Sequence, residues 1–189
     1  MEQDRASAAR CSWVNLKNPL SVQYHDTEWS VPQHDDRILF EMLMLECFQA
    51  GLSWECVLNK REGFRRAFDR FDADKISRYG DAECARLLSD PGIIRNRSKI
   101  RACVQNSRVF LEIQREYGSF DRYIWGFTEG IPVREPCNLR PVSPLSDRIS
   151  NDLKRRGMKF VGSTTIYAYL QAIGVLSAHE ETCAWHRKE

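Results

Sequence analysis

The stretch LECFQAGLSW, residues 45–54, places one carboxylate, that of Glu46, among apolar residues. If this region is a helix, Glu46 falls on the face that also carries Leu39, Met42, Leu43 and Ala50. Burial of a carboxylate costs free energy unless a partner offsets its charge. Two interpretations stay open: Glu46 is kept for a ligand, or it is paired structurally with an arginine or a helix N-terminus.

Four aromatic residues lie on either side of Glu46 in the sequence: Trp13, Tyr24 and Trp29 before it, and Trp54 eight residues after it. Each of them, taken alone, is better explained as core filling or surface anchoring. Together, aromatic faces around a buried carboxylate would suit a flat, positively charged ring that donates hydrogen bonds. The faces supply stacking and cation–π attraction, and the carboxylate accepts the N–H groups.

The two ends of the chain carry residues that could bind a metal. His179 and Cys183 are spaced i, i+4 in HEETC, so that one helical turn can direct both at one ion, and Cys11 and His25 lie near the N-terminus. This Cys₂His₂ set is typical of a structural zinc, because four protein ligands leave no open position for a reactive water. The spacing from Cys11 to His25 is not a standard zinc-finger spacing, so scattered unliganded residues are the alternative.

A second pattern suits phosphate. The segment SDRISNDLKRRG predicts a helix with Ser146 as its cap and Gly157 as its stop, and STTIYAYLQAIG predicts another helix. The connection GMKFVG, residues 157–162, would leave free N–H groups at the start of the second helix, and Lys159 would add a charge. An ordinary αα-hairpin is the alternative.

Two stretches without acidic residues are basic. Residues 91–111 carry Arg95, Arg97, Lys99, Arg101 and Arg108. Residues 153–178 carry Lys154, Arg155, Arg156 and Lys159 near their start. On a chain with a net charge of only +2, these patches fit either a phosphate-binding face or a solvated helix side.

The elements that must position these groups are predicted to be helices. Helices are expected from Asp35 or Asp36 to about Gly51, over residues 53–68 with Ser53 as cap, from Asp81, and from the turn at 89–92 to near Gly118. Residues 119–125 predict one or two further turns. No segment shows sustained period-two alternation, so the sequence predicts an all-α fold.

The length of 189 residues suits one domain. We expect a disordered tail at residues 1–10 and a single all-α domain at 11–185. Within it we distinguish a larger helical lobe at about 34–128, a hairpin region at about 146–175, and zinc-tied ends at 11–29 and 175–185. Residues 129–146 hold four of the seven prolines and predict an ordered connector.

Composition excludes several classes. Hydrophobic residues make up 42% and charged residues 29%, as in ordinary globular proteins, and no apolar run is long enough to span a bilayer. The N-terminus lacks the apolar core of a secretion signal. Seven scattered cysteines without such a signal predict reduced thiols and a cytoplasmic protein without a membrane partner.

Several segments, in this order along the chain, resemble the 3-methyladenine DNA glycosylase I family: CSW, YHDTEWSVP, LFEMLMLECFQAGLSW, VLNKREGFRRAF, GIIRNRSKI, KRRGMKFVGSTTIYAYLQAIG and HEETC. The resemblance runs from about Cys11 to Cys183. This family is a zinc-containing branch of the helix–hairpin–helix DNA glycosylases, is all-α, and acts in base-excision repair of alkylated DNA. The same fold and activity are therefore implied here.

The resemblance also implies roles for individual residues. One structural Zn²⁺ would be held by Cys11, His25, His179 and Cys183. Glu46 would be the base-recognition and catalytic carboxylate, in a pocket with Trp13, Tyr24, Trp29 and Trp54. DNA phosphate would be bound at Gly157, Lys159, Val161, Gly162, Ser163 and Thr164. Three serines, Ser12, Ser21 and Ser30, stand where family members have glycine, tyrosine and glycine, and they bear on pocket tightness and base selectivity.

The implied reaction needs little chemical assistance. Methylation of adenine at N3 makes the base cationic and weakens its glycosidic bond, so the enzyme must mainly flip the nucleotide out and hold the ring, with Glu46 accepting from the exocyclic amino group. The stretch GVLSAHEETC has no aspartate, Glu180 and Glu181 are expected to face solvent, and Lys159 belongs to the hairpin. These features predict a monofunctional hydrolase without lyase activity.

The predicted partners are double-stranded DNA with alkylated bases and free 3-methyladenine as product, and the chain is expected to be a monomer associated with the nucleoid through DNA. Two other classes remain. One is a non-catalytic, zinc-stabilised binder of alkylated DNA, which would share the fold and the metal. The other is a metallohydrolase, which the count of four ligands disfavours.

Overall fold

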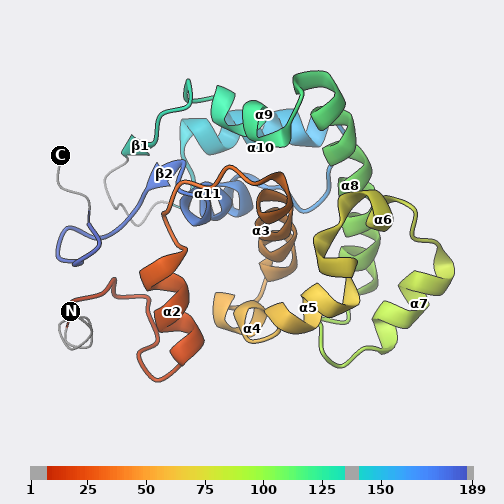
Figure 1. The fold of residues 1–189 in the computed structure, drawn as a ribbon, viewed down its shortest axis with the longest axis horizontal. Coiled ribbons are helices and arrows are strands. Elements are labelled where there is room, and N and C mark those ends of the chain that lie inside the picture. The colour runs from red at the N-terminus through yellow and green to blue at the C-terminus, as the bar shows by residue number, and fades with distance from the viewer. Residues whose placement is uncertain (1–7, 135–140, 187–189) are drawn as a thin grey trace.

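The structure is a computed structural model that describes residues 8–134 and 141–186. These residues are mostly helical, which confirms the predicted all-α class (Figure 1). The elements in chain order are α2 (Pro19–Thr27), α3 (Asp36–Gln49), α4 (Trp54–Leu58), α5 (Arg61–Ala67), the 3₁₀ turn η1 (Asp69–Phe71), α6 (Ala73–Ser77), α7 (Asp81–Ser89), α8 (Arg97–Tyr117), α9 (Phe120–Gly126), β1 (Val133–Arg134), α10 (Pro144–Arg155), α11 (Ser163–Ala172) and β2 (Leu176–Ser177).

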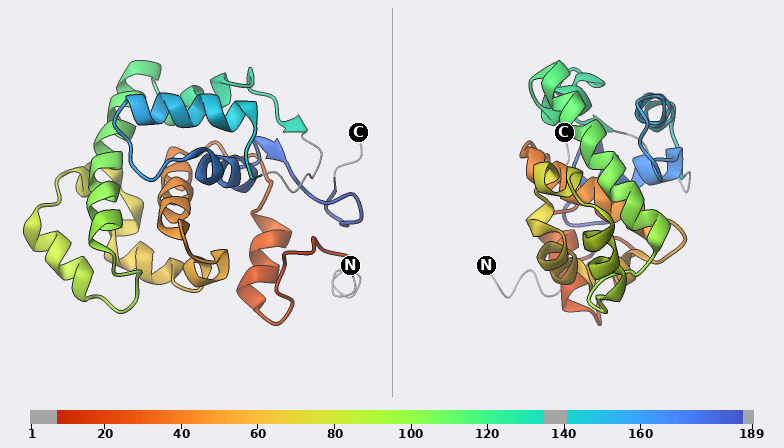
Figure 2. Two further views of the ribbon diagram at one scale, coloured as in Figure 1. Left: turned by 180° about the vertical axis from the view of Figure 1, so that it is seen from behind. Right: turned by 90° about the vertical axis from the view of Figure 1, so that its right-hand side faces the viewer.

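Helix α3 is the centre of the fold. Asp35 caps it by accepting hydrogen bonds from the N–H groups of Arg37 and Ile38, as the sequence predicts. Its residues 39–48 are all buried, because α4, α8, α9 and α11 pack around it (Figure 1, Figure 2). A helix enclosed on all sides is apolar around its whole circumference, and its two glutamates therefore need a specific explanation.

The long helix α8 passes beside α3. Asn96 caps it through Lys99 N–H, and Gly118 ends it in the left-handed conformation with φ 88°. Ile100, Cys103 and Phe110 of α8 are buried in the core. Lys99 is buried as well, and its Nζ donates to the carbonyls of Phe48 and Ala50 at the end of α3. These two bonds hold the last turn of α3 against the first turn of α8.

The hairpin lies between α10 and α11. The cap of α10 is Ser143 and not Ser146, because Pro144 occupies the first helical position and Ser146 is the reciprocal partner of Ser143 in the first turn. Gly157 turns the chain with φ 103°. The side chain of Asn106 in α8 then bonds both Lys159 N–H and Lys159 C=O, at 2.8 and 2.9 Å.

Three further expectations were wrong in detail. Residues 53–68 form two helices, with a break at Asn59 and Lys60 that lets Arg61 approach α3. Residues 178–186 form turns and not a helix, so His179 and Cys183 are brought together by a non-helical loop. Two short strands exist: β1 pairs in parallel with β2, Val133 opposite Leu176, and joins the connector to the end of α11.

The first and last described segments lie side by side, because Ala184 N–H donates to Ala9 C=O at 2.8 Å. Most of the predicted tail, residues 1–7, lies outside the described residues, as does part of the predicted connector, residues 135–140. Arg10, which was assigned to the tail, instead forms an ion pair with Asp26 at 2.7 Å. The division into two lobes with zinc-tied ends stays a prediction.

No helix within residues 8–134 and 141–186 combines the length and the apolar character that crossing a membrane requires.

Candidate functional site

A pocket of about 220 Å³ opens between α2, α3, α4 and α11. It is lined by Trp13, Tyr24, Trp29, Glu46, Gln49, Trp54, Ala168 and Gln171. The structure thus brings the predicted carboxylate and all four predicted aromatic residues to one cavity. They come from segments up to 41 residues apart in the sequence, and α11 closes the cavity from a still more distant part of the chain.

Glu46 is 4% exposed, and its Oε2 has no hydrogen-bond partner. The one other buried side-chain polar atom of the described residues without a partner is Trp54 Nε1, in the same pocket. Burial raises the pKa of Glu46 to about 8. The pocket therefore holds one acceptor and one donor at full desolvation cost, which favours a ligand as their partner.

The structural explanation of Glu46 is not supported by its neighbours. The buried arginine near this helix is Arg61, whose Nε donates to Glu41 at 2.5 Å and whose Nη1 donates to Glu28 at 2.7 Å. Arg65 also contacts Glu41. The arginines of this region are thus bound to the other carboxylate of α3, and Glu46 receives none of them.

The aromatic side chains form a continuous wall. The ring centroids of Trp13 and Trp29 are 4.9 Å apart, and those of Tyr24 and Trp54 are 5.0 Å apart. Tyr24 and Trp29 are buried, whereas Trp13 is 38% exposed at the mouth. Burial beside Glu46 raises the pKa of Tyr24, so its hydroxyl keeps its proton. This wall can stack on a flat ring and hold a cationic one.

Sequence reasoning missed three residues of the lining: Gln49, Ala168 and Gln171. Gln49 lies one turn after Glu46 in α3, and this i, i+3 spacing could have indicated it. Ala168 and Gln171 have the same spacing in α11, but no local signal directs that face toward α3. Arg61, which joins Glu28 beside Trp29 to Glu41 in α3, was also missed, because its partners are distant in sequence.

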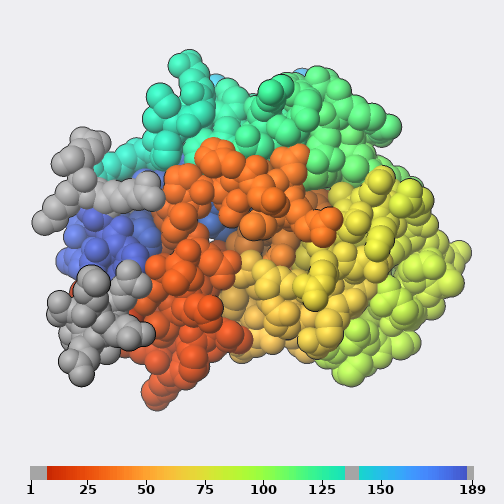
Figure 3. Space-filling view, in the orientation of Figure 1, coloured from red at the N-terminus to blue at the C-terminus, as the bar shows by residue number. Residues whose placement is uncertain are grey.

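Arg61 also borders a hollow of about 200 Å³ that residues of α2, α3, α5 and α11 line. Figure 3 shows that face: the red and orange N-terminal segments and the yellow α5 surround a depression with blue C-terminal residues at its floor. The hydrogen bonds of Arg61 join α5 to Glu41 in α3 and to Glu28 at the end of α2.

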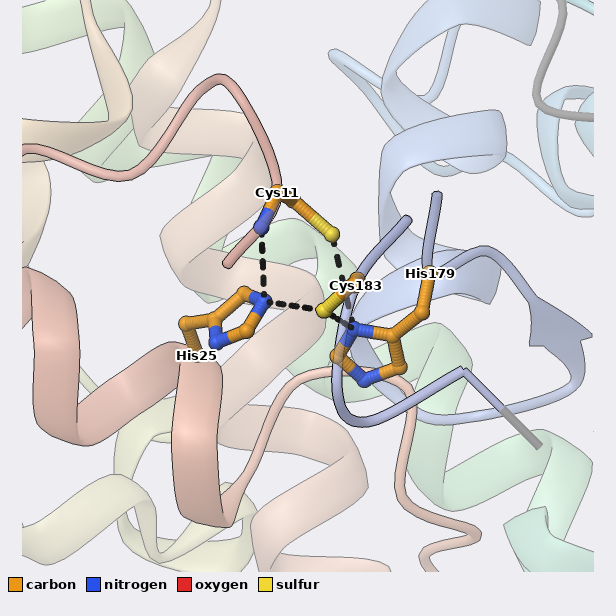
Figure 4. A group of neighbouring side chains, drawn as sticks. All are labelled: Cys11, His25, His179 and Cys183. Carbon is orange, nitrogen blue, oxygen red and sulfur yellow. Dashed lines mark hydrogen bonds between the residues drawn. The ribbon is translucent and has the colours of Figure 1, made fainter. Parts of the chain in front are cut away.

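The second predicted group also assembles. Cys11, His25, His179 and Cys183 are buried, and their ligand atoms all lie within 4.8 Å of one another (Figure 4). Cys183 Sγ lies 3.5 Å from His25 Nε2 and from His179 Nδ1, and Cys11 Sγ lies 3.5 Å from His179 Nδ1. Zinc bonds of ~2.0–2.3 Å require tetrahedral edges of ~3.3–3.8 Å. These three separations match the edges of a tetrahedral site, so the four residues could hold a metal ion.

The residues around the four ligands also suit a metal. Asp26 Oδ1 lies 2.8 Å from His25 Nδ1, which assigns the proton to that nitrogen and leaves Nε2 for an ion. Arg10 holds Asp26 in place through two nitrogens. Glu180 N–H donates to Cys11 Sγ. Glu180 is half-buried, and its carboxylate accepts from Ser12 N–H and Ser12 Oγ at the surface.

The predicted phosphate residues lie at the hairpin. Gly162 is the N-cap residue of α11 and provides no side-chain hydrogen bond, so N–H groups of the first turn, which begins with Ser163 and Thr164, have no cap. Lys159 is exposed, whereas Val161 is buried and its carbonyl accepts from Ser150. The arrangement provides free N–H donors and a cation, and its binding of phosphate stays a prediction.

The three unusual serines each have a distinct place. Ser12 bonds Glu180 beside the metal centre. Ser21 is buried in α2, and its Oγ accepts from Asn15 N–H at 3.1 Å. Ser30 has φ 61°, donates to Leu176 C=O, and accepts from Ala178 N–H. Ser12 and Ser30 therefore tie the N-terminal segment to the C-terminal one, and neither lines the pocket.

Comparison with known proteins gives a consistent result. Residues 13–187 match the sequence profile of methyladenine glycosylase. The chain is 42% identical over 178 residues to DNA-3-methyladenine glycosylase 1 of Escherichia coli (strain K12), covering 92% of this chain and 95% of that protein. It is 38% identical over 178 residues to DNA-3-methyladenine glycosylase of Haemophilus influenzae, covering 92% of this chain and 96% of that protein.

Solved structures are equally similar. A crystal structure of 3-methyladenine DNA glycosylase I superposes with a TM-score of 0.90 at 42% identity, covering 95% of this chain and 100% of that one. A structure from Staphylococcus aureus, described as giving the structural basis of 3-methyladenine recognition, superposes with a TM-score of 0.90 at 33% identity, covering 95% and 97%. The helix–hairpin–helix fold expected from the sequence therefore agrees with these relatives.

Proposed function

This chain belongs to the methyladenine glycosylase family, and from that premise we propose that it releases 3-methyladenine from alkylated duplex DNA in base-excision repair. One observation carries the proposal: Glu46 Oε2 and Trp54 Nε1, both buried and without partners, lie in the pocket that the aromatic wall encloses. A methylated adenine offers a flat cationic ring with an amino group, which matches this combination of groups.

Each pocket residue has a role in this proposal. The extruded base enters between the rings of Trp13, Tyr24, Trp29 and Trp54. Glu46 accepts a hydrogen bond from the exocyclic amino group and, when ionised, offsets the positive charge of the ring. Because the site is dry, this interaction is stronger than it would be in water. Water then adds to C1′ of the sugar as the glycosidic bond breaks, the base leaves neutral, and the proton that the water loses passes to the solvent.

The chain is proposed to be monofunctional. Lys99 of α8 is buried with its Nζ bonded to two carbonyls at the end of α3. Lys159 lies at the hairpin and does not line the pocket. A Schiff-base step needs a free amine beside the sugar. The described lining of the pocket contains no lysine, which supports hydrolysis without lyase activity.

The metal held by the Cys₂His₂ group is proposed to be one structural Zn²⁺. Sulfur and imidazole donors at tetrahedral spacing suit zinc, and four protein ligands leave no position for water. Its contribution is a crosslink between the ends of the chain.

We further propose that the protein is a monomer that acts in the cytoplasm on chromosomal DNA. Its DNA phosphates would be held at Gly157, Lys159, Val161 and the start of α11.

The test is base release from dimethyl-sulfate-treated duplex DNA at neutral pH by the wild type and Glu46→Gln, with Glu112→Gln as the control. Glu112 is exposed on α8 and does not line the pocket. Free 3-methyladenine should be released by the wild type and the control, and its rate should fall by at least ~10-fold in Glu46→Gln, because a charge-assisted hydrogen bond is lost.

The same assay separates the alternative. If the protein is a non-catalytic binder, the wild type and both variants would bind the methylated duplex, and none of them would release a base from it. Incubation with a duplex that contains an abasic site tests the second part of the proposal, and a β-elimination product would contradict the monofunctional assignment.

A further inference from the structure

Beside the hairpin lies a third hollow, of about 510 Å³, lined by Ser98, Arg101, Ala102, Gln105, Lys159 and Phe160. We propose that this groove binds backbone phosphates of the duplex beyond the nucleotide that is extruded, so that DNA contact continues from the hairpin along the N-terminal half of α8. The inference deepens the proposed function and rests on DNA being the substrate. The predicted clamp at residues 157–164 does not include any residue of α8.

The charge of this surface favours phosphate. Residues 91–111 contain no acid, and Arg95, Arg97 and Arg101 are all exposed. The nearest acid to Arg101 is Asp81, at 4.0 Å, and because both side chains are solvated this pair is weak. Arg101 is therefore available for an anion. Ser98 and Gln105 add hydroxyl and amide donors of the kind that bind phosphate oxygens.

The geometry suits a linear polyanion rather than a single ion. Ser98, Arg101, Ala102 and Gln105 are spaced i, i+3, i+4 and i+7, so they form one stripe along α8. Seven residues of helix rise by ~10 Å, which is the axial rise of about three base pairs of duplex DNA. Lys159, which belongs to the hairpin, lines the same groove. The groove thus presents donors from two elements along the length of a short stretch of backbone.

The groove is built on the same frame as the pocket. Asn106 bonds both backbone groups of Lys159 and so fixes the hairpin to α8. Lys99 fixes the first turn of α8 to Phe48 and Ala50, directly beside Gln49 of the pocket lining. Figure 2, in its left view, shows the hairpin loop passing beside α8. Phosphates bound in the groove would therefore be placed at a set position relative to the base pocket.

Arg101→Gln is the test variant, and Arg108→Gln is its matched control. Arg108 is also an exposed arginine of α8, but its Nε donates to Ser77 C=O on the side of α6, away from the hairpin. Binding to one duplex with and without a methylated base is measured by fluorescence anisotropy over a series of salt concentrations. Thermal midpoints of both variants should equal that of the wild type, because both side chains are exposed.

Arg101→Gln should weaken duplex binding by roughly 3- to 10-fold at low salt, equally for damaged and undamaged DNA. The slope of log K against log salt should fall by ~0.9 for each phosphate contact that is lost. Affinity for free 3-methyladenine should not change, and Arg108→Gln should behave as the wild type.

An unchanged salt slope in a folded Arg101→Gln would overturn the inference. So would a loss of affinity that occurs only with damaged DNA, because that pattern indicates an effect on the base pocket. The outcome is independent of catalysis: if the wild type releases no base but the slope still falls in Arg101→Gln, the groove stands and the proposed glycosylase activity does not.

Discussion

The imidazole of His25 stacks on the indole of Trp29, with ring centroids 6.0 Å apart and an angle of 23° between the planes. Trp29 also meets the ring of His179 edge-on at 4.8 Å, and Trp13 lies 5.6 Å from His25. Two residues of the candidate metal centre therefore form the back of the aromatic wall that lines the pocket. The metal centre and the pocket share this wall, so a change in one should be measurable in the other.

Removal of the metal should disorder the pocket. In Cys183→Ser, one of four ligands is weakened, and the crosslink between the chain ends is lost. The thermal midpoint should fall by ~10 °C or more, and affinity for free 3-methyladenine, followed by tryptophan fluorescence, should fall with it. Cys84→Ser is the control, because Cys84 is a half-buried cysteine outside the metal group. Full base affinity in a metal-free, folded protein would disprove the shared wall.

Asp26 should control how firmly the metal is held. Its carboxylate orients His25 through Nδ1, and outer-sphere partners of this kind contribute ~10- to 100-fold to metal affinity. Asp26→Asn should therefore lose zinc to a chromogenic chelator ~10 times faster or more than the wild type. Glu181→Gln, an exposed neighbour of the ligand Cys183, is the control and should release zinc at the wild-type rate. Equal release rates for all three proteins would exclude this role.

The stability cost of Glu46 should depend on pH. Burial raises its pKa from 4.5 to about 8, so between these values the folded state keeps a proton that the unfolded chain has released. Folding stability then falls as pH rises through this window and is constant above it, with a steepest slope of ~1.4 kcal/mol per pH unit. Glu46→Gln removes this loss. The difference in free energy of unfolding between Glu46→Gln and the wild type should therefore be small at pH 4.5 and largest, in favour of the variant, above pH 8.

Denaturant unfolding of both proteins at a series of pH values checks this expectation. The metal ligands are common to both, so their titration cancels in the difference. Glu112→Gln, at an exposed position, should show no such pH dependence. A difference between Glu46→Gln and the wild type that is constant from pH 4.5 to 8.5 would mean that Glu46 is ionised throughout in the folded protein.

Arg61 should position the pocket wall relative to α3. It bridges Glu28, next to Trp29, and Glu41 in α3, and a lysine ammonium cannot reproduce this two-sided contact. Arg61→Lys should lower stability by ~2–4 kcal/mol and also weaken binding of free 3-methyladenine. Glu28→Gln should weaken base binding in the same way, with less effect on stability, because Glu28 is partly exposed.

Arg65→Lys is the matched control for Arg61. Arg65 lies one turn later in α5 and forms ion pairs with Glu41 and Glu62, whereas Glu28 pairs with Arg61. It should therefore change stability without changing base affinity. If Arg61→Lys and Arg65→Lys lower base affinity to the same degree, Arg61 acts only through general stability.

Much of the fold followed from local patterns in the sequence. Asp35 and Ser53 cap helices as expected, α7 begins at Asp81, and α8 ends at Gly118. Caps, stops and helical periodicity involve residues a few positions apart, so a sequence window contains all the information they need. The isolation of Glu46 in an apolar helix, and the presence of two cysteines and two histidines near the chain ends, were likewise visible.

The pairings between distant segments were decided by the tertiary structure. The sequence alone left open whether an arginine neutralises Glu46, and packing directs Arg61 to Glu41 and Glu28 instead. No local pattern indicates that the carboxylate of Glu180 accepts from the hydroxyl of Ser12, 168 residues away. Gln171 reaches the pocket only because α11 packs on α3. Such contacts depend on how helices are placed in space, and the same local periodicity is compatible with many placements. Residue types thus determined which chemistry this chain can perform, and only the packing of α2, α3 and α11 brought those residues to one site.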